Sequence, residues 1–171
     1  MEEKRLGRGE KIISKTDQRG NILEGNDTFF EFCEYHPDEL VGMPHNIIRH
    51  PEMPQIVFRL LWAKLRDGQN VNAFVKNRTK YGNHYWVYAT VSPTASNIGN
   101  RKQGFYSIRK APNPAAVEQM TEIYRLLKEK EEAEGYLAAK ELLRAVLLAN
   151  ELKFNDLMKR LQAQGNTLKL P

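Results

Sequence analysis

Three segments rich in aromatic and β-branched residues follow one another between residues 70 and 110, and they constrain the fold more than any other feature of the chain. They are NVNAFVKN (70–77), HYWVYATVS (84–92) and QGFYSIRK (103–110). Side chains of these types favour strands. Because the first two segments are separated by a connection of hairpin length, Lys80–Asn83, we expect them to pair in antiparallel fashion.

Two more short strands are predicted near the N-terminus, in KIISK and NILEG within residues 11–24. Gly20 suits the turn between them because glycine tolerates positive φ. Asn26 or Asp27 can then cap a helix that runs to Cys33, and Pro37 begins a second short helix.

The segment from Pro44 to Pro54 contains three prolines, which exclude long regular structure there. An amphipathic helix, QIVFRLLWAKLRDG, follows it and ends at Gly68. This order of elements predicts an α+β domain over residues 11–111, in which a five-stranded antiparallel sheet carries helices on one face. Residues 1–10 are predicted to form an N-terminal cap on that domain.

A helical extension is predicted over residues 115–165, after the break at Pro112-Asn-Pro114. Gly135 is a plausible bend, so the extension is expected to be one kinked helix or two helices. Its apolar stripes include Leu142, Leu143, Val146 and Leu147. Two roles stay open: docking on a receptor or a second copy of the chain, or folding back over the sheet.

Charge and composition narrow the classes of function. The 171 residues suffice for one domain of ordinary size plus an extension. The net charge of +5 arises within residues 1–114, where basic side chains are spread among apolar ones. Nucleic-acid-binding domains gather such charge on one face, so we expect no nucleic-acid partner.

The single cysteine, Cys33, excludes an intrachain disulfide framework and a cysteine-rich zinc site, and it is expected to be a buried helix residue. The four histidines lack the spacing of zinc ligands, so no metal site is predicted. The N-terminus has no apolar signal-peptide core, and no stretch approaches the roughly 18 apolar residues of a membrane span. The expected location is the cytoplasm.

The motifs GNDTFFEFCEY, PHNIIRHPEMP, VKNRTKYGNHYWVYATVSP and GFYSIRK resemble the PAS domain of bacterial aerotaxis receptors over roughly residues 10–110. On a chain without membrane spans, the similarity points to the stand-alone, CetB-like form used in energy taxis. The resemblance implies a PAS fold that holds FAD non-covalently between the sheet and the helices. It also implies a partner, a membrane-bound methyl-accepting chemotaxis receptor without its own sensor domain, which would recruit the chain to the inner membrane. A homodimer stays open.

The flavin-supporting positions of the family fall on matching positions of this sequence. They are Asn26, Arg49, His50, Glu52, Phe58 and Asn77. The chain departs from the family at Glu52, where aspartate is usual, and at Val71, where tryptophan is common. Trp62 is expected to replace the aromatic wall that Val71 lacks.

These residue types also suit the cofactor chemically. Phe58 and Trp62, four residues apart on one helix face, can supply aromatic surface. Asn77 offers a donor and an acceptor to a flavin ring edge. Arg49 could pair with phosphate or with Glu52, and the second pairing would fix the loop over the cofactor. Taken singly, each of these residues also has a purely structural interpretation. Arg49 and Glu52 could form a local ion pair, Phe58 and Trp62 could be core residues, His50 could be a loop histidine, and Asn77 could be a surface residue of a strand.

The resulting prediction is a cytoplasmic redox sensor that reports energy or oxygen status to a separate chemoreceptor, and not an enzyme. The chain has no phosphate-binding loop, no Ser-His-Asp arrangement and no paired catalytic carboxylates. It has no cysteine in HNIIRHP for a light-driven flavin adduct and no histidine in the long helix for haem. The alternative is a cofactor-free PAS module for protein–protein interaction.

Overall fold

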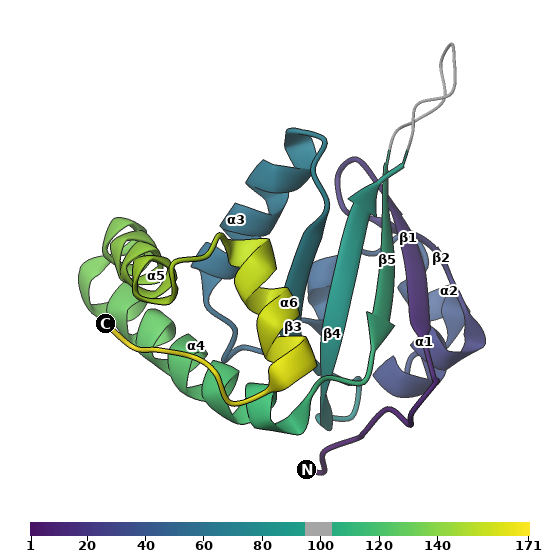
Figure 1. The fold of residues 1–171 in the computed structure, drawn as a ribbon. Coiled ribbons are helices and arrows are strands. Elements are labelled where there is room, and N and C mark those ends of the chain that lie inside the picture. The colour runs from purple at the N-terminus through teal and green to yellow at the C-terminus, as the bar shows by residue number, and fades with distance from the viewer. Residues whose placement is uncertain (95–103) are drawn as a thin grey trace.

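The computed structural model describes residues 1–94 and 104–171 of the chain, which form a five-stranded antiparallel sheet with helices on either side (Figure 1). The strands are β1 (Ile12–Asp17), β2 (Ile22–Gly25), β3 (Val71–Arg78), β4 (His84–Pro93) and β5 (Gly104–Lys110). Their order across the sheet is β2-β1-β5-β4-β3. The predicted α+β class and five-stranded antiparallel sheet are confirmed.

Four helical segments between β2 and β3 cover the inner face of the sheet. They are α1 (Asp27–Cys33), α2 (Pro37–Leu40), the 3-10 helix η1 (His45–Ile48) and α3 (Gln55–Arg66). Phe29 of α1, Leu40 of α2 and Ile48 of η1 are fully buried against sheet residues such as Val87. Burial of these side chains fixes the short helices over β1, β5 and β4, although their lengths alone would not keep them helical.

Three further helices follow: α4 (Pro114–Glu134), α5 (Tyr136–Asn150) and α6 (Phe154–Gln164). Helices α4 and α6 pack against the outer face of the sheet, and α5 packs on α3, α4 and α6. The sequence predicted one kinked helix or two. A third helix forms because the chain also turns at Glu151, whose φ of 55° lies in the left-handed region. Glycine is the usual residue in that conformation, so a glutamate gave no signal in the sequence. Gly135 separates α4 from α5 at the predicted bend.

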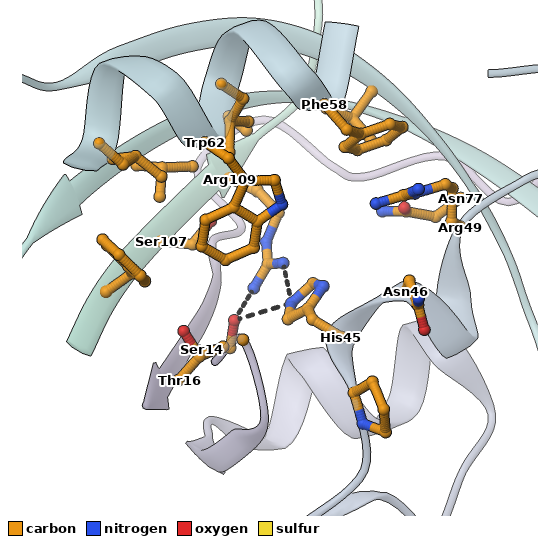
Figure 2. Close-up of a pocket in the computed structure, with 18 of the residues that line it drawn as sticks. Ser14, Thr16, His45, Asn46, Arg49, Phe58, Trp62, Asn77, Ser107 and Arg109 are labelled. Carbon is orange, nitrogen blue, oxygen red and sulfur yellow. Dashed lines mark hydrogen bonds between the residues drawn. The ribbon is translucent and has the colours of Figure 1, made fainter. Parts of the chain in front are cut away.

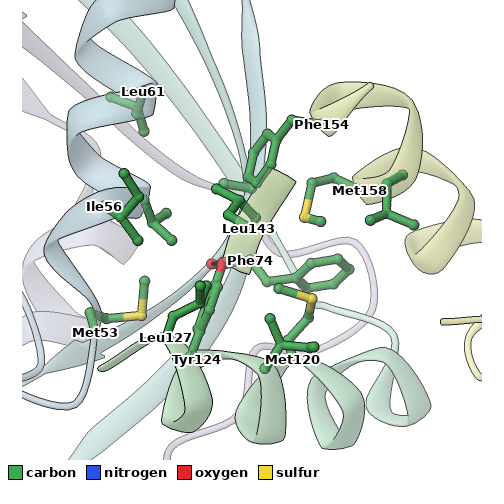
Figure 3. Packing of buried hydrophobic residues seen from close by; sticks show 14 of the residues in the cluster. Met53, Ile56, Leu61, Phe74, Met120, Tyr124, Leu127, Leu143, Phe154 and Met158 are labelled. Carbon is green, nitrogen blue, oxygen red and sulfur yellow. Dashed lines mark hydrogen bonds between the residues drawn. The ribbon is translucent and has the colours of Figure 1, made fainter. Parts of the chain in front are cut away.

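The outer helices share one hydrophobic cluster with the sheet (Figure 3). Met120 and Tyr124 of α4 point toward Phe74 of β3, and the Tyr124 hydroxyl donates a hydrogen bond of 2.6 Å to the Phe74 carbonyl. The Tyr124 ring also stacks on Trp86 of β4 at 6.0 Å. The extension therefore folds back and covers the outer face of the sheet.

Helix α3 is held by contacts from α4 and α5. Its N-cap residue, Pro54, makes no side-chain capping bond. Instead Glu131 of α4 accepts hydrogen bonds from the backbone N–H of Gln55 at 3.0 Å and of Ile56 at 2.6 Å. The cationic side chain of Arg59 also lies over the ring of Tyr136 in α5.

The N-terminal residues run beside the start of β4. The backbone N–H of Lys4 donates to the His84 carbonyl, and His84 N–H donates to the Glu2 carbonyl. Leu6 is buried in the inner cluster. Across residues 1–94 and 104–171, no helix combines the length and apolar character needed to cross a bilayer.

Candidate functional site

A cavity of about 230 Å³ lies between the inner face of the sheet, helix α3 and the segment that begins with η1 (Figure 2). Alternate residues of β1, β3, β4 and β5 point into it, as the two-residue period of a strand requires. Its lining consists of Ser14, Thr16, Arg19, Gly20, Pro44, His45, Asn46, Arg49, Phe58, Leu61, Trp62, Leu65, Val75, Asn77, Ala89, Val91, Phe105, Ser107 and Arg109.

Aromatic side chains form the wall on the helix side. Phe58 and Trp62 stand one turn apart on α3, and Trp62 meets Phe105 of β5 edge-on at 5.1 Å between ring centroids. Gly20 lies against Trp62, because a Cβ at this position would be 3.1 Å from the indole ring. Its φ of +83° also requires glycine, so the turn predicted at Gly20 places the Trp62 ring as well.

Arg49 lies at one end of the cavity, where its guanidinium carbon is 3.5 Å from the centroid of the Phe58 ring. Its backbone pairs with Asn77 in an isolated antiparallel bridge, and so the two side chains enter the cavity side by side. The Arg49 Nε is buried without a hydrogen-bond partner. Burial lowers the pKa of Arg49 from its usual value.

A second arginine, Arg109 of β5, lies on the opposite side of the cavity from Phe58 and is only 3% exposed. Its Nη2 donates to Ser14 Oγ at 2.5 Å, and its Nη1 lies 3.1 Å from His45 Nε2. Ser14 Oγ and His45 Nε2 are 3.3 Å apart, which closes a three-residue cluster. The Arg109 Nε is buried and unpaired.

His45 is neutral in this cluster. Burial and the neighbouring Arg109 lower the pKa of its imidazole from 6.5 to about 3. A neutral ring can accept hydrogen bonds at Nε2 from the guanidinium and from the serine hydroxyl. The cluster therefore carries one positive charge, on Arg109.

The electrostatic character of the cavity follows from its lining. Three arginines, Arg19, Arg49 and Arg109, are among the lining residues, and none of those residues is an aspartate or glutamate. Arg19 is exposed and lies near Asp17, whereas Arg49 is half-buried and Arg109 is buried, and neither of these two forms an ion pair within the described residues. Guanidinium groups in such surroundings favour a ligand that carries negative charge or electron-rich oxygen and nitrogen atoms. The aromatic wall adds a surface for a planar ring system.

Four of the seven residues predicted as flavin contacts line this cavity: Arg49, Phe58, Trp62 and Asn77. The structure does not bring the other three, Asn26, His50 and Glu52, into its lining. Val71, the position of the missing tryptophan, is buried in the hydrophobic cluster and also lies outside the lining.

Asn26 caps helix α1. Its Oδ1 accepts hydrogen bonds from the backbone N–H of Phe29 and of Ile13, each at 3.0 Å, and its Nδ2 donates to the Lys11 carbonyl. The bond to Phe29 caps α1, and the other two tie the cap to β1 and to Lys11 just before it. The amide therefore serves the fold, in the predicted capping role.

Glu52 points away from Arg49, and of the two pairings open to Arg49 the one with Glu52 does not form. Glu52 pairs with Lys76 at 2.6 Å, while the guanidinium of Arg49 lies over Phe58. The reason is the backbone bridge to β3, which directs Arg49 inward and leaves the Glu52 side chain 67% exposed. His50 lies beside this pair: its Nδ1 accepts from the Glu52 N–H, and its ring contacts His84 at 6.1 Å.

Ser14, His45 and Arg109 line the cavity but were not among the residues predicted from the sequence. A signal existed in the strands, because Arg109 has the same parity as Phe105 and Ser107 in β5 and so shares their face of the sheet. No comparable signal marked His45, whose position depends on the packing of η1.

Cys33 is buried at the end of α1, as predicted, and burial raises the pKa of its thiol. Within the described ranges 1–94 and 104–171, no group of three or more histidine, cysteine or acidic residues could hold a metal ion.

Comparisons with known proteins place this geometry in context. A family model described as the PAS fold matches residues 22–108. The aerotaxis receptor of Escherichia coli strain K12 is 36% identical over 116 residues, which are 68% of this chain and 22% of that protein. The biofilm dispersion protein BdlA of Pseudomonas aeruginosa is 31% identical over 84 residues, 48% of this chain and 20% of that protein. The chain thus spans about a fifth of the length of these relatives.

Two solved structures show a similar fold at low sequence identity. The light-state LOV domain of the blue-light photoreceptor Aureochrome1 has a TM-score of 0.55 and 16% identity, covering 65% of this chain and 88% of that one. A light-oxygen-voltage domain studied with a flavin analogue has a TM-score of 0.57 and 14% identity, covering 66% and 84%.

Proposed function

Because the chain belongs to the PAS family, a class of sensory modules, we propose that it is a redox sensor that binds FAD in the cavity between the sheet and helix α3. The observation that carries the proposal is a buried, partly aromatic cavity whose charged side chains are all arginines. Flavin ring systems are planar and rich in acceptor atoms, and FAD adds a pyrophosphate.

The residues present fit such a cofactor. Phe58 and Trp62 would flank the ring system, and Asn77 would pair with its polar edge. The Arg49 side chain is only partly buried and its Nε has no hydrogen-bond partner, so Arg49 is the residue suited to the phosphates, which would lie toward solvent. At about 230 Å³ the cavity is smaller than most drug-sized ligand sites, which exceed about 300 Å³, and it would enclose only part of FAD.

When bound, a flavin supplies reversible electron transfer. The chain itself supplies the surroundings. Apolar residues of β4 and α3, such as Ala89 and Leu61, would contact the ring system. The Asn77 amide would orient to match the donors and acceptors on the edge of the ring. Asn77 lies on β3, and α6 is bonded to the start of the same strand through Asn155. A change in the contacts of Asn77 would therefore act on the strand that carries α6.

The names of the relatives support a sensory role in taxis, and the proposal extends it to signalling of energy or oxygen status through a partner protein. The proposed partner is a membrane-bound methyl-accepting chemotaxis receptor that lacks its own sensor domain. In this proposal the chain is a stand-alone, CetB-like cytoplasmic protein that the receptor recruits to the inner membrane. It signals and does not catalyse a reaction on a substrate.

The deciding experiment is an absorption spectrum of the purified protein, followed by heat release and identification of any flavin. We expect stoichiometric FAD that bleaches with dithionite and returns in air. Arg49→Ala and Asn77→Ala should each weaken FAD binding at least tenfold. Arg144→Ala, which removes an exposed arginine of α5, is the matched control and should bind FAD as the wild type does.

A colourless protein that takes up no added FAD would overturn the proposal. The cofactor-free PAS interaction module would then be the better account.

A further inference from the structure

Arg109 is a buried cation without a counter-ion. Its Nη2 donates to Ser14 and its Nη1 lies against the neutral ring of His45, while its Nε has no hydrogen-bond partner among the described residues. The residue is 3% exposed, and the cation also lies 5.1 Å from the centroid of the Phe29 ring. None of these neighbours carries negative charge.

The rest of the chain does not provide the missing charge. No ion pair of Arg109 occurs within residues 1–94 and 104–171. The sequence of residues 95–103, ASNIGNRKQ, contains no aspartate or glutamate. A buried guanidinium that lacks a carboxylate is costly, whereas an anion entering the cavity would offset that cost.

We propose that Ser14, His45 and Arg109 form an anion subsite of the cavity that takes up the negative charge a bound flavin acquires on reduction. This inference rests on the proposed function. Ser14 and His45 hold the guanidinium in place, and all three residues line the cavity. The subsite differs in role from Arg49, which lies at the Phe58 end of the cavity.

The charge that a flavin ring gains on reduction explains why the subsite would favour the reduced form over the oxidised form. The oxidised ring is neutral; it takes two electrons from a reductant and one proton from solvent, so the reduced ring carries one negative charge. The reductant is dithionite in the experiment and a reduced electron-transfer partner in the cell. A fixed positive charge attracts the reduced ring more than the oxidised one, and the midpoint potential rises.

The test compares wild type, Arg109→Met, Arg109→Lys and the exposed-arginine control Arg144→Met in reductive titrations with FAD bound. In Arg109→Met we expect the affinity for the reduced form, relative to the oxidised form, to fall at least tenfold, a midpoint about 30 mV more negative for a two-electron couple. Arg109→Lys retains the charge, and its midpoint should stay closer to that of the wild type. Arg144→Met should leave the midpoint unchanged.

Thermal unfolding of the flavin-free proteins separates this role from a structural one. Removing an uncompensated buried charge should leave the unfolding temperature of Arg109→Met unchanged or raise it, because Ser14 and His45 can still pair with each other. If Arg109→Met does not fold, Arg109→Gln takes its place with the same expectations.

An Arg109→Met protein that binds FAD with the wild-type midpoint would overturn the subsite while leaving the proposed function intact. If the wild type binds no flavin, the proposed function fails, and the unfolding temperatures decide the subsite. A lower temperature for Arg109→Met would then show that Arg109 is a structural residue. An unchanged or higher one would support an anion subsite for another ligand.

Discussion

Asn26 and Asn77 are the same residue type with different roles, and the difference lies in what their amides contact. The oxygen and nitrogen of Asn26 bond to backbone groups of Ile13, Phe29 and Lys11, and the residue lies outside the cavity lining. Asn77 sits on the inner face of β3, where strand alternation directs it into the cavity. At the scale of single residues, contacts rather than residue type decide function.

His45 provides a pH-dependent prediction at this scale. Its pKa is lowered in the folded state, from 6.5 to about 3, so between these values the unfolded chain binds the additional proton. Stability from the neutral ring is therefore present above pH 6.5 and is lost as the pH falls. We expect the free energy of unfolding of wild type to decrease on acidification from pH 7 to 5, with His45 contributing no more than about 1.4 kcal/mol per pH unit.

Urea titrations at pH 7, 6 and 5 measure this dependence. His45→Gln should reduce the slope, whereas His36→Gln, at a histidine whose side chain is 69% exposed, should not. Equal slopes in wild type and His45→Gln would contradict a neutral buried His45.

Helix α3 shows how elements distant in sequence complete one another. It carries the aromatic wall of the cavity, yet its first turn lacks a side-chain cap of its own. Glu131 provides two acceptors for the unpaired N–H groups and places a negative charge at the positive end of the helix. The extension thus directly supports the helix that lines the cavity.

Glu131→Ala should lower the free energy of unfolding by about 1 kcal/mol, because two backbone donors lose their partner. Denaturant unfolding of the full chain measures the loss. Glu132→Ala is the matched control on the same helix. The Glu132 side chain is 68% exposed, and its carboxylate comes no closer than 3.9 Å to Lys128, so it forms at most a weak ion pair. Equal stability of the two variants would show that the cap contributes nothing.

The whole molecule has a sheet that is covered on both faces. Helix α3 and the segment that begins with η1 enclose the cavity on the inner face, and α4 and α6 cover the outer face, which carries Phe74, Trp86 and Tyr88. An uncovered apolar patch of this kind promotes association. The extension therefore protects the sheet as well as supporting α3.

Truncation after Ala111 should expose the outer face and make the remaining domain self-associate. Size-exclusion chromatography with light scattering would report the change in mass. Adding Trp86→Lys and Tyr88→Lys to the truncated chain should restore a monomer. A truncated chain that stays monomeric and equally stable would show that the covering is dispensable.

Signalling through a partner sets an energetic requirement on the complete assembly. Switching a two-state partner from 1:99 to 99:1 takes about 5.5 kcal/mol. For a two-electron couple this corresponds to a midpoint difference of roughly 120 mV between the two signalling conformations. For the proposed complex with a receptor, we expect the midpoint of the proposed flavin to shift by an amount of this order on binding, as redox titration of the complex would measure. An unchanged midpoint would mean that flavin reduction does not drive the complex.

The sequence by itself determined the elements that depend on interactions between residues close together in the chain. Strand composition, three prolines in Pro44–Pro54, the amphipathic period of α3 and the glycine turn at Gly20 are each set by neighbours in the chain, and they suffice for the fold class. Helical spacing likewise placed Phe58 and Trp62 on one face, and both line the cavity.

Only the tertiary structure decided which polar groups meet. Ser14, His45 and Arg109 come from β1, η1 and β5, and Glu131 reaches α3 across 75 residues of chain. The direction of Arg49, toward Phe58 and away from Glu52, follows from a backbone bridge to β3. Such contacts depend on how elements pack, and no local pattern of residues encodes them.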